Sequence, residues 1–209
     1  MASHPSFTEI FARRRDALTR ALAELSDTCA ASLEKAGGAL ADCLQKGGCV
    51  FAAGNGGSAA DAQHFIAELV GRFEAERQGL RAVSLTTNAS SLSAIANDYG
   101  YEAVFARQLE ALARPGDSVV LVSTSGNSPN ILRAAEKARA LGVTVIGLTG
   151  VGGGALATLC DIHIGAPSGQ TATVQEVHIH LLHTLCAWVD ERIRINRKGT
   201  CFGGECVAK

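Results

Sequence analysis

The sequence predicts an α/β protein, a three-layer αβα sandwich in which helices cover both faces of a five-stranded parallel sheet. Short apolar segments suited to buried strands alternate with helical segments, and long helical stretches open and close the chain. The strand segments are Cys49–Ala53, Ala82–Thr86, Ser118–Ser123, Val143–Thr149 and Asp161–Gly165. Because these strands are apolar almost throughout, both faces of the sheet should be buried under crossover helices.

The helices are predicted from apolar residues at helical spacing. Two helices are expected between Phe7 and Leu44, with a break near Asp27-Thr28 or Gly37-Gly38. The connecting helices are expected at Ser58–Phe73, Ser90–Ala96, Tyr101–Ala113, Pro129–Leu141 and Gly154–Leu159. A last helix from Thr173 to Ile195 would be about 34 Å long, more than a small sheet needs for cover. We therefore expect the N- and C-terminal helices to form a helical bundle between subunits.

Length and composition indicate a single globular domain, predicted over residues 1–195 of the 209, with a flexible tail at 196–209. The formal charge is −1 and no stripe of Lys or Arg is present, which argues against a nucleic-acid partner. Residues 1–20 are polar, and no apolar run approaches the ~20 residues of a membrane span. The seven cysteines are scattered without a CxxC pair, so we expect a cytoplasmic protein without disulfides and without a membrane partner.

Two loops rich in serine and glycine each follow a predicted strand and precede a predicted helix. They are Gly54-Asn-Gly-Gly-Ser58 and Ser123-Thr-Ser-Gly-Asn-Ser128, and Pro129 follows the second loop. Ser58 and Ser128 are expected as helix N-caps. Hydroxyls and the free N–H groups of helix N-termini bind anions, and ligands of parallel sheets bind at this edge. The loops therefore predict a site for a phosphorylated small molecule, and neither matches the dinucleotide or P-loop motif.

The helix after the first loop carries polar side chains at steps of three and four residues, which places them on one stripe. They are Asp61, His64, Glu68 and Arg72. One interpretation is a solvated face on which Glu68 pairs with Arg72. The other is half of a metal site formed by His64 and Glu68, with Asp61 orienting the imidazole of His64.

The other half of such a site could come from the last predicted helix, which contains three of the chain's six histidines. Gln175 and His183 lie about 80° apart around the helix axis, so they could converge on one point. Glu176, His180 and His183 form a competing stripe. Spacing alone does not choose between these two sets.

The two loops, the polar helix after the first loop and the histidine-rich last helix, in their order along the chain, resemble the motifs of the sedoheptulose 7-phosphate isomerases. These are single-domain proteins of the flavodoxin-like sugar isomerase (SIS) fold. The resemblance covers about residues 5–193 and depends on four blocks: Gly54–Glu68, Ala96–Tyr101, Ser123–Ser128 and Gln175–His183. It implies a homotetramer with active sites between subunits. It also implies one zinc ion per subunit, with the ligands His64, Glu68, Gln175 and His183.

The family reaction converts D-sedoheptulose 7-phosphate into D-glycero-D-manno-heptose 7-phosphate through an enediol(ate), the first step of heptose biosynthesis. Glu68 and His183 are assigned as the acid–base pair that moves the protons. The resemblance implies that further residues hold the sugar, namely Asn55, Gly56, Gly57, Ser58, Asn97, Asp98 and Gln175. For the phosphate it implies Ser123, Thr124, Ser125 and Ser128, with Arg72 nearby.

A different class of protein is the alternative: a non-catalytic SIS module that binds a sugar phosphate or another protein, of the replication-initiator-binding type. Glu68 and His183 are both present, which favours the enzyme. The chain departs from the family pattern at Ala172, where some relatives carry an acidic residue, and in the tail that contains Cys201 and Cys206.

Overall fold

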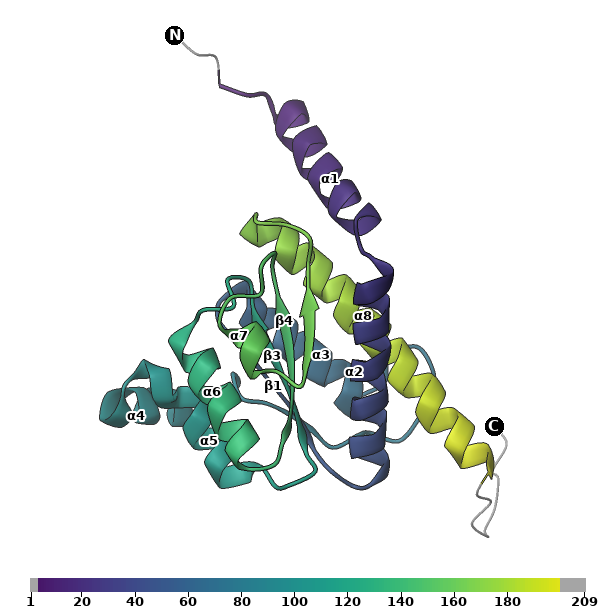
Figure 1. Cartoon of the computed structure of the whole chain (residues 1–209), viewed down its shortest axis with the longest axis vertical. Coiled ribbons are helices and arrows are strands. Elements are labelled where there is room, and N and C mark those ends of the chain that lie inside the picture. Colours follow the sequence, from purple (N-terminus) through teal and green to yellow (C-terminus); the bar gives the residue numbers. More distant parts are fainter. Residues whose placement is uncertain (1–3, 200–209) are drawn as a thin grey trace.

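The structure, a computed structural model, describes residues 4–199, and side chains through residue 194. Five strands form one parallel sheet in the order β2-β1-β3-β4-β5, the flavodoxin-like order. The strands are β1 (Val50–Gly54), β2 (Ala82–Ser84), β3 (Ser118–Ser123), β4 (Thr144–Thr149) and β5 (Ile162–Gly165). Helices cover both faces of this sheet (Figure 1), so the predicted fold class and all five strands are confirmed.

The helices follow the predicted order, and only their ends differ. They are α1 (Phe7–Ala23), α2 (Asp27–Gln45), α3 (Gly57–Val70), α4 (Ala89–Tyr99), α5 (Val104–Leu112), α6 (Pro129–Ala140), α7 (Leu156–Leu159) and α8 (Thr171–Gly199). A single 3₁₀ turn, η1 (Tyr101–Ala103), separates α4 from α5. Of the two proposed breaks near the N-terminus, the one at Asp27 is confirmed, because Ser26 caps α2 by accepting from the Cys29 N–H.

Two apolar clusters lie on opposite faces of the sheet. Helices α2, α3 and α8 pack on one face, where Leu40, Phe65 and Leu182 are fully buried. Helices α4 to α7 pack on the other face, around Phe105 and Leu109. The side chains of the central strands alternate between the two clusters, as expected for a sheet buried on both faces.

The packing of α8 against α2 explains one of the two glycines inside α2. A Cβ atom at Gly37 would lie well within van der Waals contact of the Trp188 indole of α8, whereas Gly38 has open space around it. Gly37 therefore allows the two helices to approach closely.

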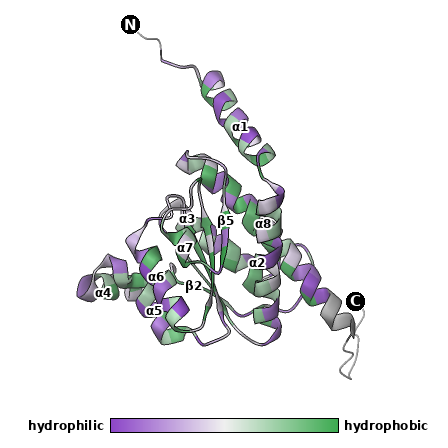
Figure 2. Cartoon of the chain, viewed as in Figure 1, coloured by the Kyte–Doolittle hydropathy of each residue, from purple (hydrophilic) through white to green (hydrophobic). Residues whose placement is uncertain are grey.

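The terminal helices extend beyond the sheet. Helix α1 projects from the body (Figure 1), and along it apolar and polar residues alternate (Figure 2). Phe7 and Phe11 on α1 are 81% and 57% exposed. Helix α8 continues to Gly199 rather than ending at Ile195, and the cysteines at 201 and 206 lie outside the described residues. Among residues 4–199, none of the helices is both long and apolar enough to cross a membrane.

Candidate active site

The first loop forms a tight turn between β1 and α3. Gly56 has a φ of 56°, a left-handed conformation that favours glycine, and it precedes the first helical residue, Gly57. A Cβ atom at Gly54 would collide with the backbone of Ser58. Because the turn is this close, the helix begins before Ser58, whose buried side chain lies in the first turn. The prediction that Ser58 is the N-cap is therefore wrong.

Helices α3 and α8 bring two histidines into direct contact. Nε2 of His64 lies 2.8 Å from Nε2 of His183, and Oε1 of Glu68 lies 3.5 Å from the same His64 nitrogen. The hydrogen bond between the imidazoles requires a proton on one of the two nitrogens and a lone pair on the other. The ring of Phe73 lies 5.4 Å from that of His183. Two predicted halves of one site, far apart in the sequence, thus meet in the fold.

Gln175 lies nearer the start of α3 than His183 does. A Cβ atom at Gly57 would be only 2.5 Å from its Nε2 atom, so the amide rests directly on the glycine. Asp61 does not hydrogen-bond to His64, because its Oδ2 is buried and has no partner among the described residues. Burial raises the pKa of Asp61 to about 6, and the nearby His64 opposes that rise. The predicted contact that would orient His64 is therefore not formed in this structure.

Arg72 was predicted as the last member of the polar stripe on the helix after the first loop, but it lies beyond the end of that helix. Helix α3 ends at Val70, and the exposed Arg72 side chain pairs with Glu76 at 3.6 Å. The interpretation in which Arg72 pairs with Glu68 is therefore wrong, because Glu68 instead approaches His64.

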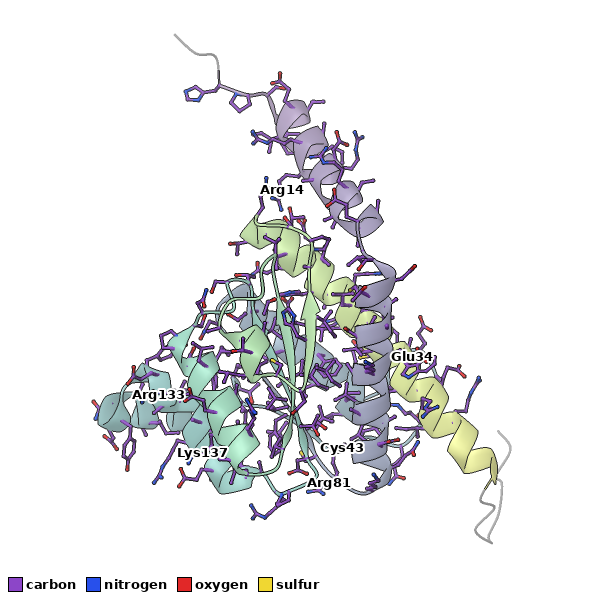
Figure 3. The ribbon with its side chains drawn as sticks, viewed as in Figure 1. Arg14, Glu34, Cys43, Arg81, Arg133 and Lys137 are labelled. Atoms are coloured by element: carbon purple, nitrogen blue, oxygen red, sulfur yellow. The ribbon has the colours of Figure 1, made fainter. Side chains whose placement is uncertain are left out.

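The competing stripe on the last helix does not assemble a site. Oε1 of Glu176 accepts from Arg14 of α1 at 2.9 Å, and Figure 3 shows Arg14 at the start of α8. His180 is exposed, and the buried His178 donates from Nε2 to the Thr149 carbonyl at 2.9 Å. Of the histidines on α8, His183 is the one that joins the side chains of α3.

The second loop follows β3 and arranges hydroxyl groups ahead of α6. Oγ of Ser123 and Oγ of Ser128 lie 3.3 Å apart, and Oγ of Ser125 accepts from the Asn127 N–H at 3.2 Å. Ser128 is the N-cap residue as predicted, but its hydroxyl contacts Ser123 instead of capping the helix. Gly126, with a φ of 65°, closes the turn against the backbone of Gly153. Thr124 is partly exposed beside these hydroxyls.

A polar network connects the two loops. Asn55 and Asn130 exchange two amide hydrogen bonds of 2.9 Å, and the Tyr101 hydroxyl donates to Oδ1 of Asn55 at 3.1 Å. The sequence motifs did not identify Asn130 or Tyr101 as residues of the site. The available signals were an asparagine two residues after the serine loop and a tyrosine in the Ala96–Tyr101 block. Asn97 and Asp98 hydrogen-bond to each other on the exposed surface of α4.

Comparison with known proteins identifies the family. Residues 15–150 match the SIS domain family. A phosphoheptose isomerase from Campylobacter jejuni is 51% identical over 170 residues, which span 81% of this chain and 91% of that protein. The chain belongs to the phosphoheptose isomerase family. The resemblance predicted from the sequence motifs is thereby confirmed.

Solved phosphoheptose isomerases have the same fold. The structure from Francisella tularensis has a TM-score of 0.86 at 36% identity and covers 90% of this chain and 100% of its own. The structure from Neisseria gonorrhoeae has a TM-score of 0.77 at 42% identity and covers 87% of this chain and 95% of its own. The fold of this phosphoheptose isomerase family member therefore agrees with that of these solved relatives over most of its length.

The donor atoms that converge here are of the kinds that zinc prefers, two imidazoles and a carboxylate. A tetrahedral zinc ion at ~2.0–2.1 Å from each nitrogen would separate the two nitrogens by about 3.3 Å. Nε2 of His64 and Nε2 of His183 are closer, at 2.8 Å, so this pair must open slightly. Within the described side chains, no three His, Cys, Asp or Glu residues already surround one metal position. The two imidazoles and the carboxylate fit zinc in chemistry, whereas the Gln175 amide rests against Gly57, nearer the start of α3.

Proposed function

We propose that this chain isomerises D-sedoheptulose 7-phosphate to D-glycero-D-manno-heptose 7-phosphate, the first step of heptose biosynthesis, in the cytoplasm. The observation that carries the proposal is the meeting of Glu68, His64 and His183 at the contact between α3 and α8. A sugar-phosphate isomerase needs such an acid–base pair beside a phosphate site. Membership of the phosphoheptose isomerase family supports the seven-carbon substrate.

The reaction moves one proton between carbons and one between oxygens. The Glu68 carboxylate takes a proton from C1 of the ketose and returns it to C2. His183 moves the second proton from the C1 hydroxyl to the oxygen on C2, which leaves a carbonyl at C1. The enediol(ate) formed between these steps lies between helices α3 and α8. Because Glu68 is 24% exposed and His183 is half-buried, the substrate can reach both groups.

The serine loop holds the phosphate at the other end of the sugar. The hydroxyls of Ser123, Ser125 and Ser128, with Thr124, lie in the loop ahead of α6, and the positive end of a helix dipole favours an anion there. Arg72 is exposed and lies beyond the C-terminal end of α3, so within one subunit it is not near this loop. Ser125→Ala should raise KM several-fold with little change in kcat, because phosphate binding supplies uniform binding energy. An unchanged KM would contradict the role of this loop.

The sugar hydroxyls are held by the polar groups around the first loop. The side chains involved are Asn55, Ser58, Asn97, Asp98 and Gln175, together with the backbone of Gly56 and Gly57. The hydrogen bonds with Asn130 and Tyr101 fix the orientation of the Asn55 amide and leave its second N–H available to donate. Asn55 is therefore prepared to bind a hydroxyl group without reorganisation.

One zinc ion per subunit would be held by His64, Glu68, Gln175 and His183. When bound, such an ion polarises the substrate carbonyl and stabilises negative charge on its oxygen. Metal analysis of the purified protein should find zinc, and His64→Ala should lose it, because an imidazole ligand disappears. Zinc retained in full by His64→Ala would place the metal elsewhere.

The active unit is a homotetramer in which residues 1–195 act as one domain and the active sites lie between subunits. Two apolar surfaces support this assembly: the projecting α1 with its exposed Phe7 and Phe11, and a groove of about 530 Å³ between α2 and α8. Leu33, Leu185 and Trp188 line that groove. Light scattering should give four times the mass of the chain, and Phe11→Asp should reduce it.

Turnover of sedoheptulose 7-phosphate tests the proposal. The wild-type protein should convert it, whereas Glu68→Gln and His183→Gln should reduce kcat by at least 100-fold and leave the fold intact. Equal and negligible rates in all three proteins, together with binding of the sugar phosphate, would instead favour the non-catalytic binding module.

A further inference from the structure

Arg77 and Asp190 form a buried ion pair beside the proposed catalytic groups. Arg77 lies in the segment after α3, and Nε of its side chain contacts Oδ1 of Asp190 on α8 at 2.5 Å. Both side chains are only 7% exposed. Sequence motifs gave no signal for this pair, because the two residues are far apart in the chain and belong to no family block identified above.

The guanidinium of Arg77 also caps the C-terminal end of α3. It donates to the carbonyls of Glu68 at 2.8 Å, Leu69 at 2.9 Å and Gly71 at 3.3 Å. Carbonyls in the last turn of a helix lack partners within the helix, and a cation there also matches the helix dipole. The backbone of Glu68 is thus held directly by this side chain.

Asp190 connects the same guanidinium to the helix of His183. The two residues are seven positions apart on α8, so they lie on nearly the same face about 10 Å apart. Cys186 lies between them, and burial raises the pKa of its thiol to about 12, with further contributions from the charges of Glu68 and Asp190. Glu68, Asp190 and Arg77 therefore lie around one buried point between α3 and α8.

We infer that Arg77 and Asp190 are positioning residues that hold the backbone of Glu68 at a fixed place relative to His183. This inference rests on the function proposed above, since it names what keeps the acid–base pair aligned. Stability alone is a weak reason for the ion pair, because replacing buried ion pairs with apolar residues of similar volume is often neutral or stabilising. Groups that orient metal ligands and catalytic carboxylates typically affect metal affinity or activity by about 10–100-fold.

The test compares two variants of the Arg77–Asp190 ion pair, called the clamp variants below, with a matched control elsewhere in the fold. Arg77→Met removes the guanidinium, and Asp190→Asn keeps an oxygen that can still accept from Arg77. The control is Asp117→Asn, at an aspartate buried to a similar degree that accepts from the Cys49 and Arg114 N–H groups where β1 and β3 begin. For each protein, kcat, KM, thermal stability and zinc affinity by chelator competition are measured.

Arg77→Met should lower kcat and zinc affinity by about 10–100-fold, with KM within about twofold of wild type. Asp190→Asn should lose less, and Asp117→Asn should lose thermal stability but keep kcat and zinc affinity. If Arg77→Met does not fold, Asp190→Asn decides, since any positioning role predicts a lower kcat at unchanged KM. Clamp variants with wild-type kcat, or with losses equal to those of Asp117→Asn, would overturn the inference. Failure of the proposed function would instead appear as a wild-type protein without turnover. In that case zinc affinity would still test the positioning role of the Arg77–Asp190 ion pair.

Discussion

Replacing Gly57 by alanine tests how the start of α3 holds Gln175. The new Cβ atom would lie 2.5 Å from Nε2, 2.7 Å from Cδ and 2.8 Å from Oε1 of that amide. Since ordinary contacts between such atoms are about 3.5–4.0 Å, the amide must move by about 1 Å. A displacement of this size in an active site can cost about 100-fold in rate, or about 2.7 kcal/mol of transition-state stabilisation.

Stability should change little in this variant. Gly57 is exposed, its φ is not positive, and Gln175 can swing its flexible end away. We therefore expect Gly57→Ala to reduce kcat/KM for sedoheptulose 7-phosphate by about 10–100-fold, with a Tm within a few degrees of wild type.

A double-mutant cycle tests whether the displaced Gln175 amide causes the loss of kcat/KM in Gly57→Ala. If the methyl group acts by displacing the amide, Gly57→Ala should have no further effect once Gln175→Ala has removed that amide. Steady-state kinetics of the two single variants and of the double variant measure this directly. Losses that multiply in the double variant, or a Gly57→Ala protein within twofold of wild type, would refute the reasoning.

Two further predictions concern stability. Gly37→Ala and Gly38→Ala both gain up to about 1 kcal/mol of helix propensity, but Gly37→Ala also displaces Trp188 at about 1–3 kcal/mol. Thermal unfolding should therefore rank Gly37→Ala several degrees below Gly38→Ala, and the reverse order would contradict the packing of α8 on α2. Burial lowers the pKa of His178, so below about pH 6.5 the unfolded chain binds a proton that the native state does not. Wild-type stability should fall more between pH 7.5 and 5.5 than that of His178→Gln, which can keep the donor; equal falls would contradict this.

Local sequence patterns predicted most of the fold, because each element carries its own signal. The interior strand Ser118–Ser123 was predicted with its observed bounds, since the apolar run is too short for a helix, is rich in valine and lies between polar turns. Errors fell at element ends, where the backbone geometry decides. Ser58 is a good N-cap residue by type, yet the close turn at Gly54 starts the helix earlier. Arg72 continued the helical spacing, yet α3 had already ended at Val70.

The sequence by itself determined the fold class, the two hydroxyl-rich loops and the set of possible ligands, because these depend on residue types and on spacing within one element. Only the tertiary structure decided that His183 rather than His180 meets His64, and that Glu176 turns instead to Arg14. It alone revealed that Arg77 joins Glu68 to Asp190. Which side chains of two distant helices face each other depends on how the helices cross, and crossing is fixed by packing across the whole core.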